Sequence, residues 1–168
     1  MIRPVVQIPN AILRKRAQPV AQITDEIHQL VADMKDTMYH EPGVGLAAPQ
    51  IGVSLRVIVY DSPENKEGFQ VLINPKITKS QGQQKGPEAC LSIPDISGDV
   101  IRAEEIHVEG LRPDGQTVSL ELKHFTARIV QHEIDHIDGV LFIDRLTPSD
   151  KMLAEKKLKK LSASAPSL

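Results

Sequence analysis

The chain has 168 residues, of which 40% are apolar and 25% charged, and its formal net charge is −2. This length fits one domain that can bury roughly two thirds of its unfolded surface, so folding does not require disulfides or a structural metal. The small net charge excludes a global basic field for DNA or anionic lipid, and 3% aromatic residues argue against a stacking platform for single-stranded nucleic acid.

The same composition bears on where the protein works. Its one cysteine, Cys90, cannot form an internal disulfide, which fits a reducing compartment. Residues 1–9 lack the apolar stretch of a signal peptide, and no segment reaches the ~18 apolar residues that a membrane span needs. We expect a cytoplasmic protein with no membrane contact, and the mature form of an organellar protein stays open as an alternative.

A first helix is predicted from Thr24 to about His40. Thr24 can serve as its N-cap, and the acidic residues Asp25 and Glu26 suit the positive end of the helix dipole. Apolar residues then recur at helical spacing: Ile27, Leu30, Val31, Met34 and Met38. The run His-Glu-Pro-Gly at 40–43 ends the helix.

The middle of the chain changes to strands. Four segments rich in Val, Ile and Leu fit that pattern: 56–60, 71–74, 100–110 and 116–123. Because Pro-Asp-Gly at 113–115 is a turn signal, we expect the last two strands to form a hairpin.

A second helix is predicted over 126–137, ending near Gly139, and Thr147-Pro148 begins a third, with proline in the tolerated first position. The small, polar residues 162–168 are expected to fray, which leaves one domain over 1–161. Helices at both ends of a strand-rich middle indicate an α+β fold. We expect mostly antiparallel strands packed around a central metal-binding helix, with an N-terminal and a C-terminal helix.

The metal-binding pattern is His132-Glu133-Ile134-Asp135-His136. Residues four apart lie on one face of a helix, so His132 and His136 can direct two imidazoles at one point. Glu133 follows the first of them, and its carboxylate can reach a water on that metal without being a ligand. The alternative is that these are ordinary surface side chains of a helix.

A third ligand is needed to complete the site. Downstream of His136 there is no further histidine, and none of the carboxylates stands in a recognisable pattern. Upstream lies Cys90, in Glu-Ala-Cys-Leu-Ser-Ile-Pro at 88–94. A thiolate would complete a two-histidine, one-cysteine set that leaves one position open for water. The alternative for Cys90 is a buried structural cysteine.

Residues 43–52, Gly-Val-Gly-Leu-Ala-Ala-Pro-Gln-Ile-Gly, form the third informative segment. The segment matches a phosphate-binding loop only weakly, because no Lys-Ser or Lys-Thr pair follows it and it comes after a helix instead of a strand. A helix end followed by a tight turn would explain its glycines. Neither interpretation explains why the amide side chain of Gln50 stands in an otherwise apolar loop.

The segments GVGLAAPQIG, EACLSIP and QHEIDHIDG together resemble the signature of the peptide deformylases, in that family's order and approximate spacing. The resemblance covers nearly the whole chain, from about Gln7 to Leu146. It implies a hydrolase that removes the N-formyl group from the initiator methionine of new polypeptides in protein biosynthesis, with release of formate. It also favours a bacterial source.

The resemblance also implies roles for individual residues. The metal ligands would be Cys90, His132 and His136, and the catalytic acid and base would be Glu133. The Gln50 side chain and the Leu91 backbone N–H would bind the formyl oxygen, and Gly45 would lie where the substrate backbone passes. The family uses Fe(II) in cells, and a cysteine with two histidines also suits Zn, Ni or Co in a preparation. In this mechanism a metal-bound water attacks the formyl carbon while Glu133 moves the protons.

Two departures from the family pattern stand near Cys90. Ala89 occupies a position where the family commonly has glycine, and alanine would be strained there if φ were positive. We expect an extended conformation that accepts alanine. Members often carry an arginine soon after the cysteine, whereas Arg102 is the first one here, so we expect different substrate contacts near that strand.

A pocket for the methionine side chain is predicted beside the metal helix, at Ile129 and Val130, with His124 and Phe125 just before them and help from Val44, Leu46 and Ile93. Plain core packing is the alternative for each of these residues. The segment 148–161 carries five lysines against two acidic residues, a local charge of +3. It is either a solvated helix face or a contact with the ribosome.

Two rival functions remain at this stage. An HExxH endopeptidase would cleave internal peptide bonds and would not need Cys90. A relative that binds metal or formyl peptides without turnover would lack catalytic positions, and all of them are present here.

Overall fold

The computed structural model describes residues 1–164, with side chains to residue 160. Its helices are α1 (Asp25–His40), α2 (His124–Ile137) and α3 (Pro148–Ser164), with short 3-10 helices η1 (Ala11–Arg14), η2 (Ala48–Ile51) and η3 (Phe142–Asp144). Its strands are β1 (Gly45–Ala47), β2 (Val57–Tyr60), β3 (Gln70–Gln81), β4 (Gln84–Cys90), β5 (Ile93–Arg102), β6 (Glu105–Leu111) and β7 (Thr117–Lys123).

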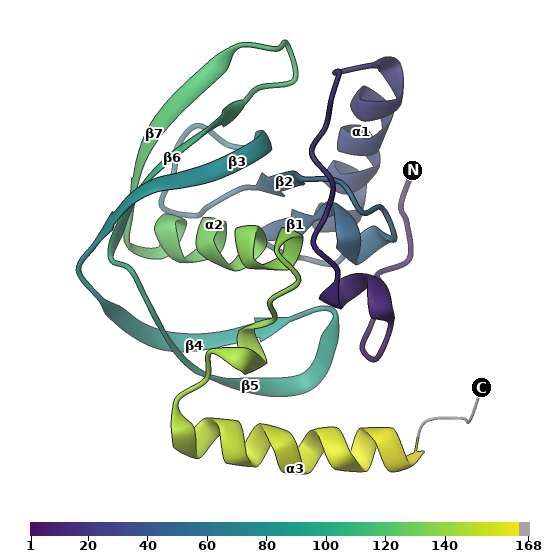
Figure 1. Ribbon diagram of the computed structural model, residues 1–168, viewed down its shortest axis with the longest axis vertical. Coiled ribbons are helices and arrows are strands. Elements are labelled where there is room, and N and C mark those ends of the chain that lie inside the picture. Colours follow the sequence, from purple (N-terminus) through teal and green to yellow (C-terminus); the bar gives the residue numbers. More distant parts are fainter. Residues whose placement is uncertain (165–168) are drawn as a thin grey trace.

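The strands form two antiparallel sheets with α2 between them (Figure 1). Five strands pair in the order β1-β2-β3-β6-β7, and β4 pairs with β5 alone. Helix α1 covers the far side of the larger sheet at its β1 and β2 end, and α3 lies under the smaller sheet. This confirms the predicted α+β fold of antiparallel strands around a central helix.

Strand β2 shows why the core has two faces. All four of its residues are buried, and successive side chains of a strand point to opposite faces of a sheet. Ile58 and Tyr60 pack in one cluster with α2, whereas Val57 and Val59 pack with α1. The five-stranded sheet is therefore the central apolar layer, and α2 is held by its own apolar side against that layer.

Helix α1 confirms the first predicted helix. Thr24 is its N-cap, although the threonine side chain makes no capping hydrogen bond. Helix α2 begins at His124, two residues before the predicted start, and α3 begins at Pro148 as predicted. α3 continues to Ser164, and residues 165–168 lie outside the described residues, so the fraying predicted for 162–168 stays a prediction. Within the described chain, no helix is both long and apolar enough to cross a bilayer.

The prediction of one strand over 100–110 is wrong. β5 ends at Arg102 in the smaller sheet, and β6 starts at Glu105 in the larger one. Between the two strands, the backbone of Ala103 bonds to side chains instead of to a neighbouring strand. Its N–H donates to Gln131 Oε1 at 3.1 Å, and its carbonyl accepts from Gln131 and Gln84, each at 3.0 Å. The chain therefore changes sheets at this point. The hairpin of β6 and β7 is confirmed, with Gly115 at φ +87° in its turn.

Candidate metal centre

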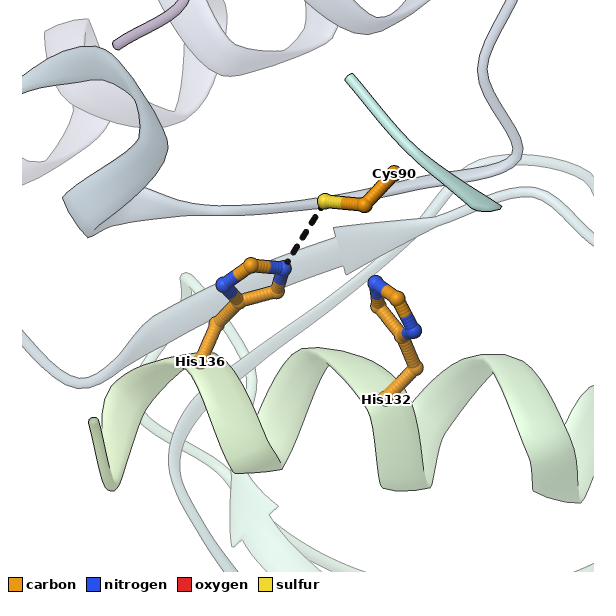
Figure 2. Close-up of side chains that lie close together, drawn as sticks. All are labelled: Cys90, His132 and His136. Carbon is orange, nitrogen blue, oxygen red and sulfur yellow. Dashed lines mark hydrogen bonds between the residues drawn. The ribbon is translucent and has the colours of Figure 1, made fainter. Parts of the chain in front are cut away.

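Three side chains of the ligand types converge between α2 and the end of β4 (Figure 2). The ligand atoms of Cys90, His132 and His136 all lie within 4.8 Å of one another, and Cys90 Sγ is 3.3 Å from His136 Nε2. The two rings stand one helical turn apart with their centroids 5.0 Å apart, and both point to the side from which Cys90 approaches. The structure thus brings together the three residues that sequence reasoning selected.

The histidine environments fit a divalent metal. His132 Nδ1 is 2.9 Å from Glu88 Oε1, which fixes the ring and leaves Nε2 for a ligand bond. Burial lowers the pKa of His136 well below its usual value, so this imidazole is neutral and can donate a lone pair. For His132, burial acts in the same direction, but hydrogen bonds with Cys90 and Glu88 raise its pKa to about 10.

Glu88 is the buried anion that supports His132. Arg102 donates to both of its oxygens, at 2.9 and 2.8 Å, and Arg128 adds a third contact at 2.5 Å. Burial by itself would raise the pKa of Glu88, but the hydrogen bonds from Arg102 and His132 hold it well below the usual range. Arg102 is only 5% exposed, so it lies in this ion pair and not on a substrate surface.

Glu133 lies on the same helix with a free carboxylate oxygen. Its side chain is buried, and among the described residues its Oε1 has no hydrogen-bond partner. Burial raises its pKa to about 7. The carboxylate packs against Gly45, where a Cβ would lie 2.6 Å from Glu133 Oε2. A side chain at position 45 would therefore displace Glu133, which accounts for one of the glycines in the loop.

The structure explains why the polar side chain of Gln50 stands in an apolar loop. It lies in η2 and is 2% exposed. Its Oε1 accepts from the Ala47 N–H at 2.9 Å, so the amide nitrogen is turned toward the site, 3.2 Å from Ser92 Oγ and 3.5 Å from Cys90 Sγ. The side chain is thus pre-oriented as a donor beside the proposed ligands.

A pocket opens next to these residues. It encloses about 190 Å³, below the range of roughly 300–1,000 Å³ typical of drug-sized ligands, so it fits a single side chain. Its lining includes Val44, Gly45, Gln50, Leu91, Phe125, Ile129 and Glu133. Four other residues that were predicted at this pocket do not line it. Leu46 and Val130 are fully buried in the core, and Ile93 borders a neighbouring groove. His124 pairs with Glu104 on the surface.

The polypeptide deformylase family model matches residues 2–152. The chain belongs to the peptide deformylase family. It is similar to the enzyme of Acidobacterium capsulatum, with 43% identity over 96% of each chain, and to that of Symbiobacterium thermophilum, with 49% identity over 85% of this chain and 66% of the relative. The crystal structure of a Legionella pneumophila peptide deformylase is similar over 99% of this chain, with 42% identity and a TM-score of 0.87.

As a peptide deformylase, the protein is a metal-dependent hydrolase that removes the N-formyl group from nascent polypeptides. Family membership sets aside the endopeptidase and the binding protein without turnover as rival functions. Ala89, the departure from the family pattern, lies within β4 and is not among the residues with positive φ. Its expected extended conformation is confirmed, so alanine is not strained there.

Sequence reasoning missed several residues that support the centre: Glu88, Ser92, Arg128 and Asp135. The signal for Arg128 was present, because a charged residue stands within the apolar run 127–130 of α2. Such a residue must be paired if it is buried, and Arg128 is 6% exposed. Glu88 and Ser92 flank Cys90 in the segment 88–94, but nothing in the sequence indicated that either side chain supports the centre.

A second group of ligand-type residues lies on the outer face of the larger sheet. Glu105, His107 and Glu121 also have ligand atoms within 4.8 Å of one another. His107 and Glu121 are directly opposed on β6 and β7, and Lys79 of β3 is opposite His107 on its other side. This is a cross-strand row of mixed charge on an exposed sheet face.

Proposed function

We propose that Cys90, His132 and His136 hold the family's divalent cation and that Glu133 is the proton carrier of deformylation. The observation that carries this proposal is the meeting of three ligand side chains with a buried carboxylate, beside one small pocket. Among the described residues, Oε1 of that carboxylate has no hydrogen-bond partner. A thiolate with two imidazoles suits Fe(II), and Zn, Ni or Co in a preparation. When bound, the cation supplies a Lewis acid that activates water and polarises the formyl oxygen.

Glu133 takes the proton of the attacking water as the water oxygen bonds to the formyl carbon. It then delivers that proton to the peptide nitrogen as the C–N bond breaks, which releases formate and a free amino terminus. A pKa of about 7, raised by burial, suits both acts, because the group can accept and release a proton near neutral pH. Gly45 supports this role by leaving room for the carboxylate.

The oxygen of the formyl group becomes negative as water adds. We propose that the Gln50 side-chain amide and the Leu91 backbone N–H donate to it. Gln50 is supported by its fixed amide orientation, and Leu91 by its place directly after Cys90 in the pocket lining. Preorganised donors of this kind act without reorganising during the reaction, and losing one typically costs ~3–4 kcal/mol.

The methionine side chain is assigned to the pocket beside the centre. Val44 and Ile129 provide apolar walls, and we propose that the substrate backbone passes Gly45, which lines the same pocket. Ile129 is 4% exposed and Val44 is 39% exposed, so the pocket has a buried inner wall and an open rim. The volume of about 190 Å³ fits a single side chain.

The basic α3 segment, residues 148–161, is proposed to contact the ribosome, where formylated chains emerge, within the bacterial cytoplasm. Lys151, Lys156, Lys157 and Lys159 are exposed, while Ala154 packs against the core. Residues 1–161 would form the single catalytic domain. Replacing Lys156 and Lys159 with Glu should reduce ribosome co-sedimentation, whereas Lys66→Glu in an exposed loop should not. Unchanged co-sedimentation would leave α3 as a solvated helix.

The mechanism is tested with formyl-Met-Ala-Ser and formate release, with unformylated casein as the control substrate. Glu133→Ala should retain the metal and lose turnover. Retained metal with full activity would remove Glu133 from the mechanism. Gln50→Leu should lower turnover with little change in metal content, and unchanged turnover would exclude Gln50 as a donor to the formyl oxygen.

A further inference from the structure

A row of charged side chains runs from the protein surface to His132. Arg145, in the segment after η3, donates to both oxygens of Asp135, at 2.6 and 3.0 Å. Arg102 donates to Asp135 at 2.6 Å and, with its other nitrogens, to both oxygens of Glu88. Glu88 in turn contacts the His132 ring at 2.9 Å.

Burial changes sharply along this row. The side chains of Glu88 and Arg102 are 4% and 3% exposed and that of Asp135 is 12% exposed, whereas the Arg145 side chain is 47% exposed. Asp135 Oδ1 has Arg145 as its one hydrogen-bond donor among the described residues, and Oδ2 is shared by Arg145 and Arg102. Asp135 therefore depends on a half-exposed arginine to complete its hydrogen bonds.

The row also connects the parts of the chain that supply the ligands. Asp135 and His132 lie on α2, Glu88 lies on β4 two residues before Cys90, and Arg102 ends β5. The guanidinium of Arg102 is planar, so the direction in which Asp135 holds it also sets the plane that meets Glu88. A shift of Asp135 is thereby transmitted to Glu88, and through Glu88 to the ring of His132 and to the strand that carries Cys90.

We propose that Arg145 is a positioning residue for the metal centre: it fixes Asp135 against Arg102, and the resulting orientation of Glu88 keeps His132 in ligand geometry. The inference rests on the proposed ligand set of Cys90, His132 and His136. Arg145 does not line the pocket beside the centre, and its hydrogen bonds go to Asp135 and not to a proposed ligand. Its effect therefore appears first in how firmly the metal is held.

The chain offers a matched control in Arg14. This side chain is also 47% exposed, and it pairs with Asp144, the residue next to Arg145, at 2.5 Å. Both arginines thus tie down the segment around η3. Only Arg145 is connected to Glu88 and His132, so a purely structural role would make the two Ala variants behave alike.

The experiment uses the full chain loaded with Co(II), whose absorption reports ligand geometry, and follows the loss of metal to a chelator. Each variant is measured at a temperature equally far below its own Tm, which removes differences in stability. Arg145→Ala should release metal about 3–10-fold faster than wild type, less than the 10–100-fold typical of direct partners of a ligand. Arg145→Lys keeps the charge but loses the bidentate contact, so its rate of metal release should lie between those of wild type and Arg145→Ala. The release rate of Arg14→Ala should match that of wild type.

Equal release rates and equal Co(II) spectra for Arg145→Ala and Arg14→Ala would overturn the inference. A parallel measurement on Cys90→Ser and His132→Ala separates it from the proposed ligand set. If those two variants still hold one metal as tightly as wild type, the ligand set itself is wrong. If they lose it while the two arginine variants are indistinguishable, the ligand set stands and only the role of Arg145 fails.

Discussion

Within residues 1–160, two places bring three ligand-type side chains close together. Cys90, His132 and His136 meet between α2 and β4, and the other trio, Glu105, His107 and Glu121, meets on the outer face of β6 and β7. Ligand atoms lie within 4.8 Å of one another in both. The groups differ in their surroundings. The His136 ring is buried and Glu88 supports His132, whereas Glu121 is 65% exposed and Lys79 stands opposite His107.

This difference shows that proximity of donors is not sufficient for a metal centre. In the buried group, Arg102 and Arg128 neutralise Glu88, and Glu88 orients His132. In the outer group, the contacts of His107 with glutamates span 3.6 to 4.0 Å at the surface. Exposed pairs of that kind are screened by water and typically contribute about 0–1 kcal/mol. We therefore expect the two groups to respond very differently to mutation.

The largest expected effect is the loss of the metal in Cys90→Ser. A hydroxyl is a much weaker ligand than a thiolate, so bound metal and formate release should both fall by on the order of 10²-fold or more, since even partners outside the ligand shell are worth 10–100-fold. Elemental analysis after dialysis, together with the formate assay, measures both quantities. A serine variant with a full complement of metal and normal turnover would contradict the ligand role of Cys90.

Glu88→Gln should produce the next largest effect. The amide cannot balance Arg102 and Arg128, and breaking a buried pair typically costs about 3–5 kcal/mol. Metal affinity should fall about 10–100-fold because His132 loses its anionic partner. Denaturant unfolding measures the loss of stability, and a chelator competition measures the loss of metal affinity. Glu121→Gln is the matched control from the outer group, and a Glu88 variant that behaves like it would remove the contrast between the two sites.

The free energy of unfolding should depend on pH because Glu133 is buried. Its pKa is raised from 4.5 to about 7, so the folded state holds a proton that the unfolded chain releases between these values. The resulting stability is complete below pH 4.5 and is lost as pH rises to about 7, on the order of 3 kcal/mol in the metal-free protein. Unfolding free energies across this range test it. Glu133→Gln should be less pH-dependent than wild type, and identical profiles would count against the raised pKa.

The smallest expected effect belongs to His107→Gln. This change removes the imidazole from the outer group while keeping a polar side chain on the exposed sheet face. Stability should change by no more than ~0.5 kcal/mol, as is usual for surface substitutions, and metal content and formate release should stay at wild-type values. A measurable loss of bound metal would mean that the outer group also holds a cation, and the comparison between buried and exposed sites would have to be revised.

Much of this protein follows from its sequence alone. Helical spacing placed His132 and His136 on one face with Glu133 beside them, because a helix repeats every 3.6 residues whatever lies around it. The turn at 113–115 and the proline at 148 are equally local signals, and they correctly predicted a hairpin and the start of α3.

Only the tertiary structure decided how the distant parts meet. Nothing local in residues 84–90, which include Gly86 and Pro87, indicates the strand that carries Cys90 to the helix, and the break between β5 and β6 depends on side chains of Gln84 and Gln131 from elsewhere in the chain. The pairing of Glu88 with Arg102 depends on burial, which a charged residue in the sequence does not reveal. Local periodicity therefore determined which side chains share a helix face, whereas packing between elements far apart in the chain decided which charges are buried and what each of them supports.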